Sequence, residues 1–305
     1  CSHSPHVYWP ENDGYDTANV ELPPTFIDTP ETRRYRTMYY TDITLMDRRL
    51  GAVYDSVKQH LGENTLFIYT SDHGAQWPFG KWNLYDAGIR VPMLAVWPGR
   101  IKPKSTCDAM ISFADVLPTF IELTAESRDE SRETRDGESG SGPSTLGFRL
   151  DGRSFAAVLR GDAAEHRDEI YATHSGDGNM NVYPIRCVRT RTHKYILNLH
   201  PEFEYATHID LGSNPDGLEF WRSWERAAES DPRAAEIVAR YHRRPREELY
   251  DLRTDPHELH NLADSPQHAE LLADLRGKVK AWMKSQGDPG RVFGEPRPLA
   301  VSPKP

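Results

Sequence analysis

The chain has 305 residues, of which 37% are hydrophobic and 27% charged, and its formal net charge at pH 7 is −9. This length allows one large domain or two ordinary ones, and the acidic balance excludes a general nucleic-acid-binding protein, which needs an excess of Lys and Arg. No apolar run approaches the roughly 20 residues that span a bilayer. Three cysteines without a close pair exclude a disulfide framework and a cysteine-rich zinc site, and we expect Cys107 and Cys187 to be buried thiols.

Helical and strand-like patterns alternate after a proline-rich loop over residues 1–30. Apolar side chains at three- and four-residue spacing predict helices, and short apolar runs without alternation predict strands covered on both faces. In chain order these patterns predict a helix over 32–61, strands over 65–71 and 91–97, and a helix over 112–123. This alternation predicts a layered α/β domain over residues 1–165.

Residues 126–145 contain no apolar side chain, which predicts a flexible surface insertion. After about residue 165 the pattern changes to short strands separated by turns, followed by a terminal amphipathic helix. The segments in order are strands over 169–173, 184–190 and 194–199, helical residues 217–243, a strand over 249–252 and a helix over 266–285. They predict a smaller α+β subdomain over 166–305, with an antiparallel sheet, a C-terminal helix and a loose tail from about residue 287.

A carboxylate and an imidazole, Asp72 and His73, follow directly after the first predicted strand, and a lysine, Lys81, follows soon after. Ligands collect at the carboxyl ends of strands in open α/β sheets. The pair could hold a divalent cation, and Lys81 could hold an anion bound to that cation. Ca²⁺ and Mg²⁺ prefer oxygen donors, and one such pair does not complete their shell. The competing interpretation is an ordinary turn beside a solvated lysine.

The run Ser-Asp-His-Gly at 71–74, with the Gly-Lys pair at 80–81 and Arg-Val-Pro at 90–92, resembles the second metal-binding segment of the type I sulfatases of the alkaline phosphatase superfamily. Residues 248–263 are similar to the closing signature of that family. Residues 171–174, 183–188 and 194–198 are similar to its heparan N-sulfatase (sulfamidase) branch. The resemblance covers roughly residues 1–285.

The resemblance implies an alkaline-phosphatase-like α/β/α domain, incomplete here, and hydrolysis of sulfate esters or sulfamates of sulfated glycans. It implies Ca²⁺ or Mg²⁺, a formylglycine nucleophile and a periplasmic or extracellular location. The roles that it implies are metal binding for Asp72 and His73, catalysis for His6 and Lys81, and substrate binding for His3 and His174. After His174 the chain departs from the branch pattern, with Ser175 and Gly176 where the branch has His and Glu.

Two parts of the family pattern are missing from this sequence. The Cys/Ser-x-Pro-x-Arg motif that yields formylglycine does not occur, and neither does the early Asp-Asp metal pair. We therefore expect a chain truncated at its N-terminus that does not hydrolyse sulfate esters alone. Three alternatives remain: a phosphodiesterase or phosphonate monoesterase of the same superfamily, a non-catalytic glycan-binding remnant, and an inactive fragment with an exposed sheet edge.

Overall fold

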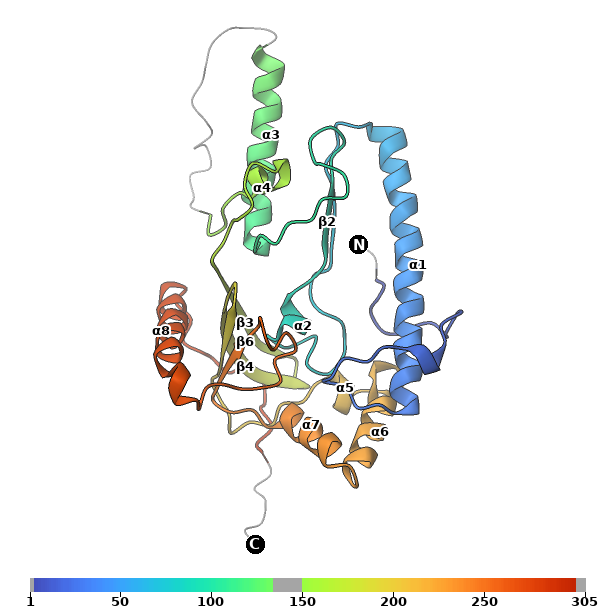
Figure 1. Ribbon diagram of the computed structural model, residues 1–305, viewed down its shortest axis with the longest axis vertical. Helices are drawn as coiled ribbons and strands as arrows, with labels where there is room; N and C mark the ends of the chain where they lie inside the picture. Colours follow the sequence, from blue (N-terminus) through green and yellow to red (C-terminus); the bar gives the residue numbers. More distant parts are fainter. Residues whose placement is uncertain (1–2, 134–149, 300–305) are drawn as a thin grey trace. The chain divides into compact units, whose positions relative to one another are not determined.

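The computed structural model describes residues 3–133 and 150–299 (Figure 1). The chain divides into two compact units. Unit 1 contains Cys1–Val57, Thr70–Met93 and Tyr171–Pro305, and unit 2 contains Lys58–Tyr69 and Leu94–Ile170. All six predicted site residues lie in unit 1. The domain boundary expected near residue 165 stays a prediction for the complete protein.

Unit 1 opens with loop residues and then the long helix α1 (Pro30–Leu61), whose residues up to Val57 belong to this unit. The helix begins at Pro30 because proline suits the first helical position, and the Thr29 hydroxyl accepts a hydrogen bond from the Thr32 backbone N–H at 3.1 Å. The inner face of α1 packs into an aromatic core. Members of this core include Trp9, Phe26, Tyr35, Trp77, Phe220 and Trp224.

A four-stranded sheet organises the rest of unit 1, in the order β3 (Glu169–Asp177), β4 (Asn181–Thr190), β5 (His193–Asn198) and β6 (Glu247–Asp251). The β4–β5 and β5–β6 pairs are antiparallel. Helix α8 (Ala269–Ser285) packs through Leu272, Leu275 and Val279 in one apolar cluster with Val188, Tyr195 and Leu249 of the sheet. The predicted antiparallel sheet with a C-terminal helix is therefore confirmed.

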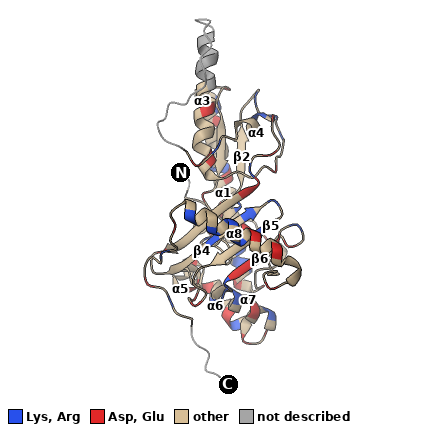
Figure 2. Cartoon of the chain, turned by 90° about the vertical axis from the view of Figure 1, so that its left-hand side faces the viewer, with Lys and Arg blue, Asp and Glu red and all other residues tan. Residues whose placement is uncertain are grey.

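Shorter helices complete unit 1. They are η1 (Thr17–Asn19), α2 (Asp86–Ile89), α5 (His208–Leu211), η3 (Asn214–Asp216), α6 (Leu218–Ala228), α7 (Pro232–His242) and η4 (Pro266–His268). Acidic and basic positions are interspersed in the view of Figure 2, where α8 and α7 carry both signs. Among the described residues, no helix is long and apolar enough to cross a membrane.

The tail after residue 287 was expected to be loose, and the structure instead bonds it to unit 1. The Leu299 backbone N–H donates to the Glu202 carbonyl at 3.0 Å, and Glu204 N–H donates to the Arg297 carbonyl at 2.7 Å. Asp288 forms an ion pair with the buried Arg186 guanidinium. Composition alone gave no sign of these backbone pairings, and residues 300–305 lie outside the described residues.

Unit 2 contains most of strands β1 (Phe67–Thr70) and β2 (Met93–Val96), which pair in a two-stranded sheet. The prediction of strands covered on both faces is wrong for the described residues. All four β1 residues are half-buried, and in β2 Leu94 is 57% and Val96 37% exposed. Because the described residues add no third strand or second cover to this sheet, one face of β2 stays open.

Unit 2 also contains η2 (Phe113–Asp115), α3 (Val116–Glu133) and α4 (Ala156–Arg160). Helix α3 continues past the predicted end at residue 123, so the first part of the expected flexible insertion is helical; Glu and Arg, frequent there, are good helix formers. Residues 134–149 lie outside the described residues. Cys187 is buried as expected, whereas Cys107 is exposed because it lies in a surface loop.

Candidate functional site

The segment between Asp72 and Ile89 folds tightly back on itself. The Gly74 N–H donates to the Gly88 carbonyl at 2.8 Å, and the Lys81 N–H donates to the Ala75 carbonyl at 2.8 Å. A Cβ atom on Gly74 would lie 1.9 Å from the Ala87 carbonyl oxygen, so only glycine fits. These bonds fix Asp72 and His73 at the start of the segment and Lys81 in its middle.

Two bulky residues beside Lys81 have left-handed backbone conformations. Phe79 has φ = 64° and Trp82 has φ = 66°, and both side chains are buried. Such conformations cost roughly 1–3 kcal/mol each and persist only where the surroundings enforce them. The Trp82 indole stacks on the His208 imidazole, with 5.2 Å between ring centroids. The backbone around Lys81 is therefore held in a strained shape by packing, which is typical of functional sites.

Lys81 lies against His6, which precedes it by 75 positions. The Lys81 Nζ is 3.2 Å from His6 Nε2. The His6 Nδ1 lies 2.6 Å from the Val7 carbonyl oxygen, and since a carbonyl only accepts, Nδ1 carries the proton. Nε2 is then the acceptor of a hydrogen bond from the ammonium group. The His3 ring lies 4.8 Å from the His6 ring, so three of the predicted residues meet here.

The Lys81 ammonium is half-buried and lies 4.7 Å from the centre of the Trp82 ring, a cation–π geometry. Burial lowers the pKa of Lys81, because desolvation disfavours the charged form, although Asp177, Asp72 and Asp216 act in the opposite direction. Within the described ranges His6 is the one hydrogen-bond acceptor of this ammonium, so a partly desolvated group of three donors has donors left for an incoming anion.

Asp72 and His73 present two donor atoms to the same point. His73 Nδ1 lies 2.9 Å from the Gly74 carbonyl oxygen, so Nδ1 carries the proton and Nε2 keeps its lone pair. That Nε2 is 3.5 Å from Asp72 Oδ2. Two donors at this separation, each about 2.4 Å from one ion, would subtend about 90° at it, as neighbouring ligands do.

The pair fits two adjacent positions of a cation shell and no more. Asp72 is exposed, and its Oδ1 accepts the His73 backbone N–H at 3.0 Å. The described residues contain no group of three or more His, Cys, Asp or Glu arranged to hold a metal ion. Any complete shell therefore needs further oxygen ligands from outside this set.

His174 is placed on β3, and no direct contact joins it to Lys81 or Asp72 among the described residues. Its Nε2 is hydrogen-bonded to Asn181 Oδ1, and the Asn181 amide donates to the Ala206 carbonyl at 2.6 Å. Because Asn181 Oδ1 accepts, His174 Nε2 carries the proton and Nδ1 is the atom left for a ligand. Burial lowers the pKa of His174.

Sequence reasoning missed a second group of residues around Lys81. The Trp82 Nε1–H donates to Asp177 Oδ2 at 2.7 Å, and His208 Nε2 lies 3.5 Å from the same oxygen. Asp177 thus holds the ring over which Lys81 lies, and it also acts electrostatically on His174. The available signals were weak: Trp82 directly follows Lys81, and Asp177 follows His174 by three positions.

Comparison with solved structures assigns the fold to the sulfatases, which are of the alkaline-phosphatase-like class. A structure described as a 2-O GAG sulfatase aligns with 94% of this chain and 55% of its own, with a TM-score of 0.58 at 19% identity. The phosphonate monoester hydrolase of Agrobacterium radiobacter aligns over 90% of this chain and 46% of its own, with a TM-score of 0.52 at 20% identity. At these identities the likeness concerns the fold alone.

The sequence agrees with the fold. Residues 1–126 match the family model described as Sulfatase. An ulvan-active sulfatase of Formosa agariphila is 32% identical over 88% of this chain and 46% of its own length. Human N-sulphoglucosamine sulphohydrolase is 29% identical over 90% of this chain and 53% of its own length. The chain thus spans about half the length of these curated relatives, and the predicted sulfatase resemblance is confirmed.

Proposed function

We propose that this chain supplies the anion-binding and metal-binding half of a sulfatase site that acts on a sulfated saccharide. The contact between Lys81 and His6 carries the proposal, because it joins two motifs that are 75 positions apart in the sulfatase-like segment. In this site the Lys81 ammonium binds oxygens of the sulfuryl group, where negative charge shifts as the bond to sulfur breaks. Lys81 is suited to this role because burial strengthens a point charge.

His6 is the proposed group for proton transfer to the leaving alcohol or amine. Its Nε2 lone pair faces Lys81 and not the protein interior, while Nδ1 is fixed by the Val7 carbonyl. A proton held at Nε2 would lie beside the sulfuryl group bound by Lys81, which is the position that a general acid needs. His3, whose ring lies 4.8 Å from that of His6, and His174, through Nδ1, are proposed to contact the saccharide.

Asp72 and His73 would hold two positions of a Ca²⁺ or Mg²⁺ shell. When bound, the cation supplies positive charge that polarises a sulfate oxygen. The chain's own contribution is orientation: Gly74 fixes the His73 ring by its carbonyl, and the backbone bonds of the segment fix the distance to Lys81. The proposed nucleophile, formylglycine, has no source in this sequence, so the 305-residue chain alone is expected to bind and not to turn over.

The names of two relatives support a saccharide substrate, since one acts on ulvan and the other on N-sulphoglucosamine. Neither name decides between an ester and a sulfamate for this chain. The superfamily alternative, phosphonate or phosphate ester hydrolysis, has the fold of the phosphonate monoester hydrolase in its favour. The sequence similarity favours the sulfatase proposal, because the matched family model and both relatives are sulfatases.

The test uses the purified 305-residue chain. Binding of inorganic sulfate and of methylphosphonate is measured by calorimetry with and without Ca²⁺, for the parent and for Lys81→Ala and His6→Ala. We expect sulfate to bind more tightly than methylphosphonate and Ca²⁺ to strengthen sulfate binding. Lys81→Ala is expected to weaken sulfate binding about tenfold or more. Sulfate affinity that is equal in the parent and in Lys81→Ala would refute the proposal. Hydrolysis of 4-nitrophenyl sulfate by the chain alone would refute the expectation that turnover needs a nucleophile that this sequence does not contain.

A further inference from the structure

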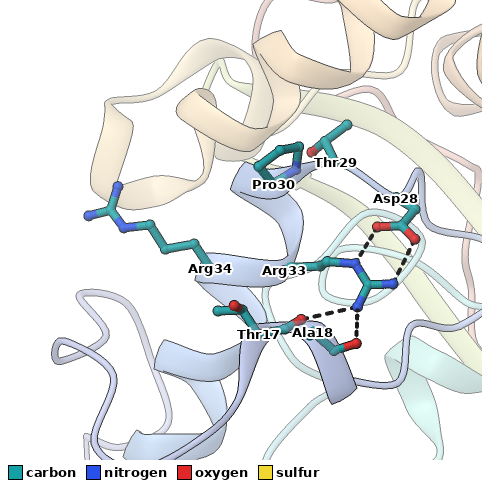
Figure 3. A pocket seen from close by; sticks show the side chains of 7 residues that line it. All are labelled: Thr17, Ala18, Asp28, Thr29, Pro30, Arg33 and Arg34. Carbon is teal, nitrogen blue, oxygen red and sulfur yellow. Dashed lines mark hydrogen bonds and ion pairs between the residues drawn. The ribbon is translucent and has the colours of Figure 1, made fainter.

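Two pockets of unit 1 are lined by arginines of α1: Arg33 and Arg34 line the first, and Arg36 lines the second. Arg33 and Arg34 have carboxylate partners, whereas Arg36 has none among the described residues. In the first pocket, of about 530 Å³ (Figure 3), Arg33 forms a two-pronged ion pair with Asp28 at 2.6 and 2.7 Å. The Nη1 group of this guanidinium donates to the carbonyls of Thr17 and Ala18. The charge of Arg33 is therefore offset by Asp28.

The second pocket, of about 340 Å³, lies against the segment that carries Lys81. Residues 75 and 77–80 form one side of it, and α1, the residue that follows α2, and α7 contribute one arginine each. These arginines are Arg36, Arg90 and Arg240. Three guanidiniums in one small pocket of an acidic chain need an explanation, because like charges are brought together only when an anion or a structural partner offsets their repulsion.

Arg36 has aromatic neighbours and no anionic one. Its guanidinium carbon lies 4.8 Å from the ring centre of Tyr40, 5.4 Å from that of Tyr39 and 5.7 Å from those of Phe26 and Trp77. The rings stabilise the cation through its faces, and no hydrogen bond from its in-plane N–H groups is found among the described residues. Its Nε is buried and has no hydrogen-bond partner among the described residues, whereas buried donors in proteins are usually paired.

The other charges of this pocket do not supply that partner. Arg240 donates to the Glu258 carbonyl and lies 5.1 Å from the Phe79 ring. Arg90 is exposed; its backbone N–H donates to the Asp86 carbonyl, but its guanidinium has no hydrogen bond or ion pair within the described parts of the chain. The pocket has two carboxylates, Asp86 and Glu258, and both already pair with the buried Lys194, at 2.5 and 2.9 Å.

We propose that this second pocket is a binding site for an oxyanion, the sulfate or carboxylate group of an acidic sugar unit, held by Arg36 and Arg90. A guanidinium fork matches two oxygens of either group, and the aromatic walls suit the apolar face of a sugar ring. The volume is at the lower end of the range for ligand pockets, which fits one sugar unit. The sugar identity rests on the proposed function; the anion site does not.

The site is separate from the Lys81 site but shares its backbone. Residues 75 and 77–80 line the pocket, and the Lys81 N–H is bonded to the Ala75 carbonyl. An anion that ties Arg36 to this segment would hold the strained Phe79 backbone in place. Occupation of the second pocket is therefore expected to strengthen anion binding at Lys81, a positive coupling between two sites.

The test uses the Lys81→Ala chain, in which sulfate binding at the first site is removed. Sulfate and D-glucuronate are titrated in separate experiments while the Nε–H signals of the arginines are followed by ¹H–¹⁵N NMR, with chloride as the ionic-strength control. We expect the Arg36 signal to move with either oxyanion and Arg36→Gln to weaken binding at least tenfold. Arg36→Lys is expected to weaken it less, because the charge stays and the fork is lost.

Arg34→Gln is the matched control, since Arg34 is on the same helix and is exposed in ion pairs with Glu219 and Glu11. It is expected to leave both titrations unchanged. If the Arg36 signal does not move in the Lys81→Ala chain, the proposal is overturned; this test does not require a substitution of Arg36. Equal weakening by Arg34→Gln and Arg36→Gln also overturns it, as a general charge effect. If the unsubstituted chain binds no sulfate through Lys81 but the Arg36 signal still moves, the proposed function fails and this inference stands.

Discussion

Lys81 donates a hydrogen bond from its ammonium group to Nε2 of His6, 3.2 Å away. The same imidazole is fixed on its other side by the Val7 carbonyl, so the lone pair has one possible direction. His73 repeats this arrangement, with Nδ1 bonded to the Gly74 carbonyl and Nε2 facing Asp72. Two histidines of unit 1 thus use a backbone carbonyl to direct a basic nitrogen toward a place where a charged ligand is expected.

The buried position of Lys81 predicts how anion binding depends on pH. Because burial lowers the pKa of Lys81, its charge is lost at a lower pH than that of an ordinary lysine. Sulfate affinity is therefore expected to fall as the pH rises above neutrality, before exposed lysines titrate. Lys81→Arg should keep the affinity up to a higher pH, since guanidinium stays charged. Calorimetric titrations at pH 7, 8, 9 and 10 check this, and identical pH profiles for the two proteins would contradict it.

The Asp72 and His73 pair predicts weak binding of a divalent cation by the chain alone. Asp72→Asn is expected to lower Ca²⁺ affinity about tenfold or more, because a charged oxygen ligand is replaced by a neutral one. Asp108→Asn, at an exposed loop carboxylate of unit 2, is the control and should change nothing. Isothermal titration with Ca²⁺ and Mg²⁺, with and without sulfate, measures both. Equal Ca²⁺ affinity in the parent and in Asp72→Asn would contradict the assignment.

The Trp82–Asp177 hydrogen bond predicts that removal of Asp177 weakens sulfate binding, whereas electrostatics alone predicts that it strengthens sulfate binding. Removing a nearby carboxylate should strengthen sulfate binding if only charge matters. Asp177→Ala also frees the Trp82 ring that holds Lys81, so we expect it to weaken binding about threefold to tenfold. Asp216→Ala, which removes another carboxylate that acts on Lys81 without touching Trp82, should strengthen it.

A double-mutant cycle in the same assay separates the effect of the Asp177 charge from the effect of its hydrogen bond to Trp82. Trp82→Phe removes the indole donor but keeps a ring near Lys81, and it should reproduce part of the loss. If Asp177 acts through Trp82, then Asp177→Ala should add little in the Trp82→Phe protein, a coupling of about 0.5–3 kcal/mol. Additive effects of the two changes would show that Asp177 acts on the anion directly.

The pattern of residues predicted the parts of this protein that local sequence determines. Helix α1 follows from its apolar spacing and Pro30, and β4 to β6 follow from short runs of strand-forming residues. The meeting of His6 with Lys81 was expected from the motifs, but its geometry depends on tertiary contacts. Likewise, the tautomers of both histidines follow from backbone carbonyls whose positions no side-chain pattern encodes.

The failures have a common physical origin in long-range contacts. The tail at 287–299 looks loose by composition, yet its backbone pairs with residues 202–204. The sequence pattern did not single out Asp177, and its role appears only when Trp82 is brought beside it. The burial of β1 and β2 was overestimated, because apolar residues in a strand show that the strand can be buried and do not show which elements bury it. The described residues leave one face of β2 open.

The buried Asp115 carboxylate of unit 2 predicts that the protein loses stability in acid. Asp115 is fully buried and pairs with Arg167, which donates to both of its oxygens. Burial alone would raise the pKa of Asp115, but Arg167 and the backbone N–H groups of Arg153 and Ser112 lower it from 3.8 to about 2. A depressed carboxyl pKa contributes stability that is present above pH 3.8 and is lost as the pH falls through about 2.

This linkage is worth about 2–3 kcal/mol above pH 4. Asp115→Asn leaves Arg167 without its anion and should destabilise the chain by about 3–5 kcal/mol at pH 7. It should also flatten the dependence of stability on pH between 2 and 4. Urea unfolding at several pH values, compared with Asp108→Asn, measures both quantities. A parallel pH dependence in Asp115→Asn and the parent would show that other carboxylates control the acid transition.

Two glycines predict opposite outcomes for the same change to alanine. At Gly74 an added Cβ would meet the Ala87 carbonyl oxygen at 1.9 Å, and neither backbone can move without breaking the Gly74–Gly88 hydrogen bond. Gly74→Ala is therefore expected to destabilise unit 1 by about 2–4 kcal/mol and to displace the neighbouring His73. Gly51 lies within α1 with nothing within 4 Å of its Cβ position, so Gly51→Ala should stabilise by about 0.5–1 kcal/mol. Urea unfolding gives both values, and the His73 imidazole signals in NMR show whether the metal-binding pair survives at temperatures where Gly74→Ala is folded. A Gly74→Ala protein as stable as the parent would mean that the segment from Asp72 to Lys81 is not held as tightly as the Gly74–Gly88 bond implies.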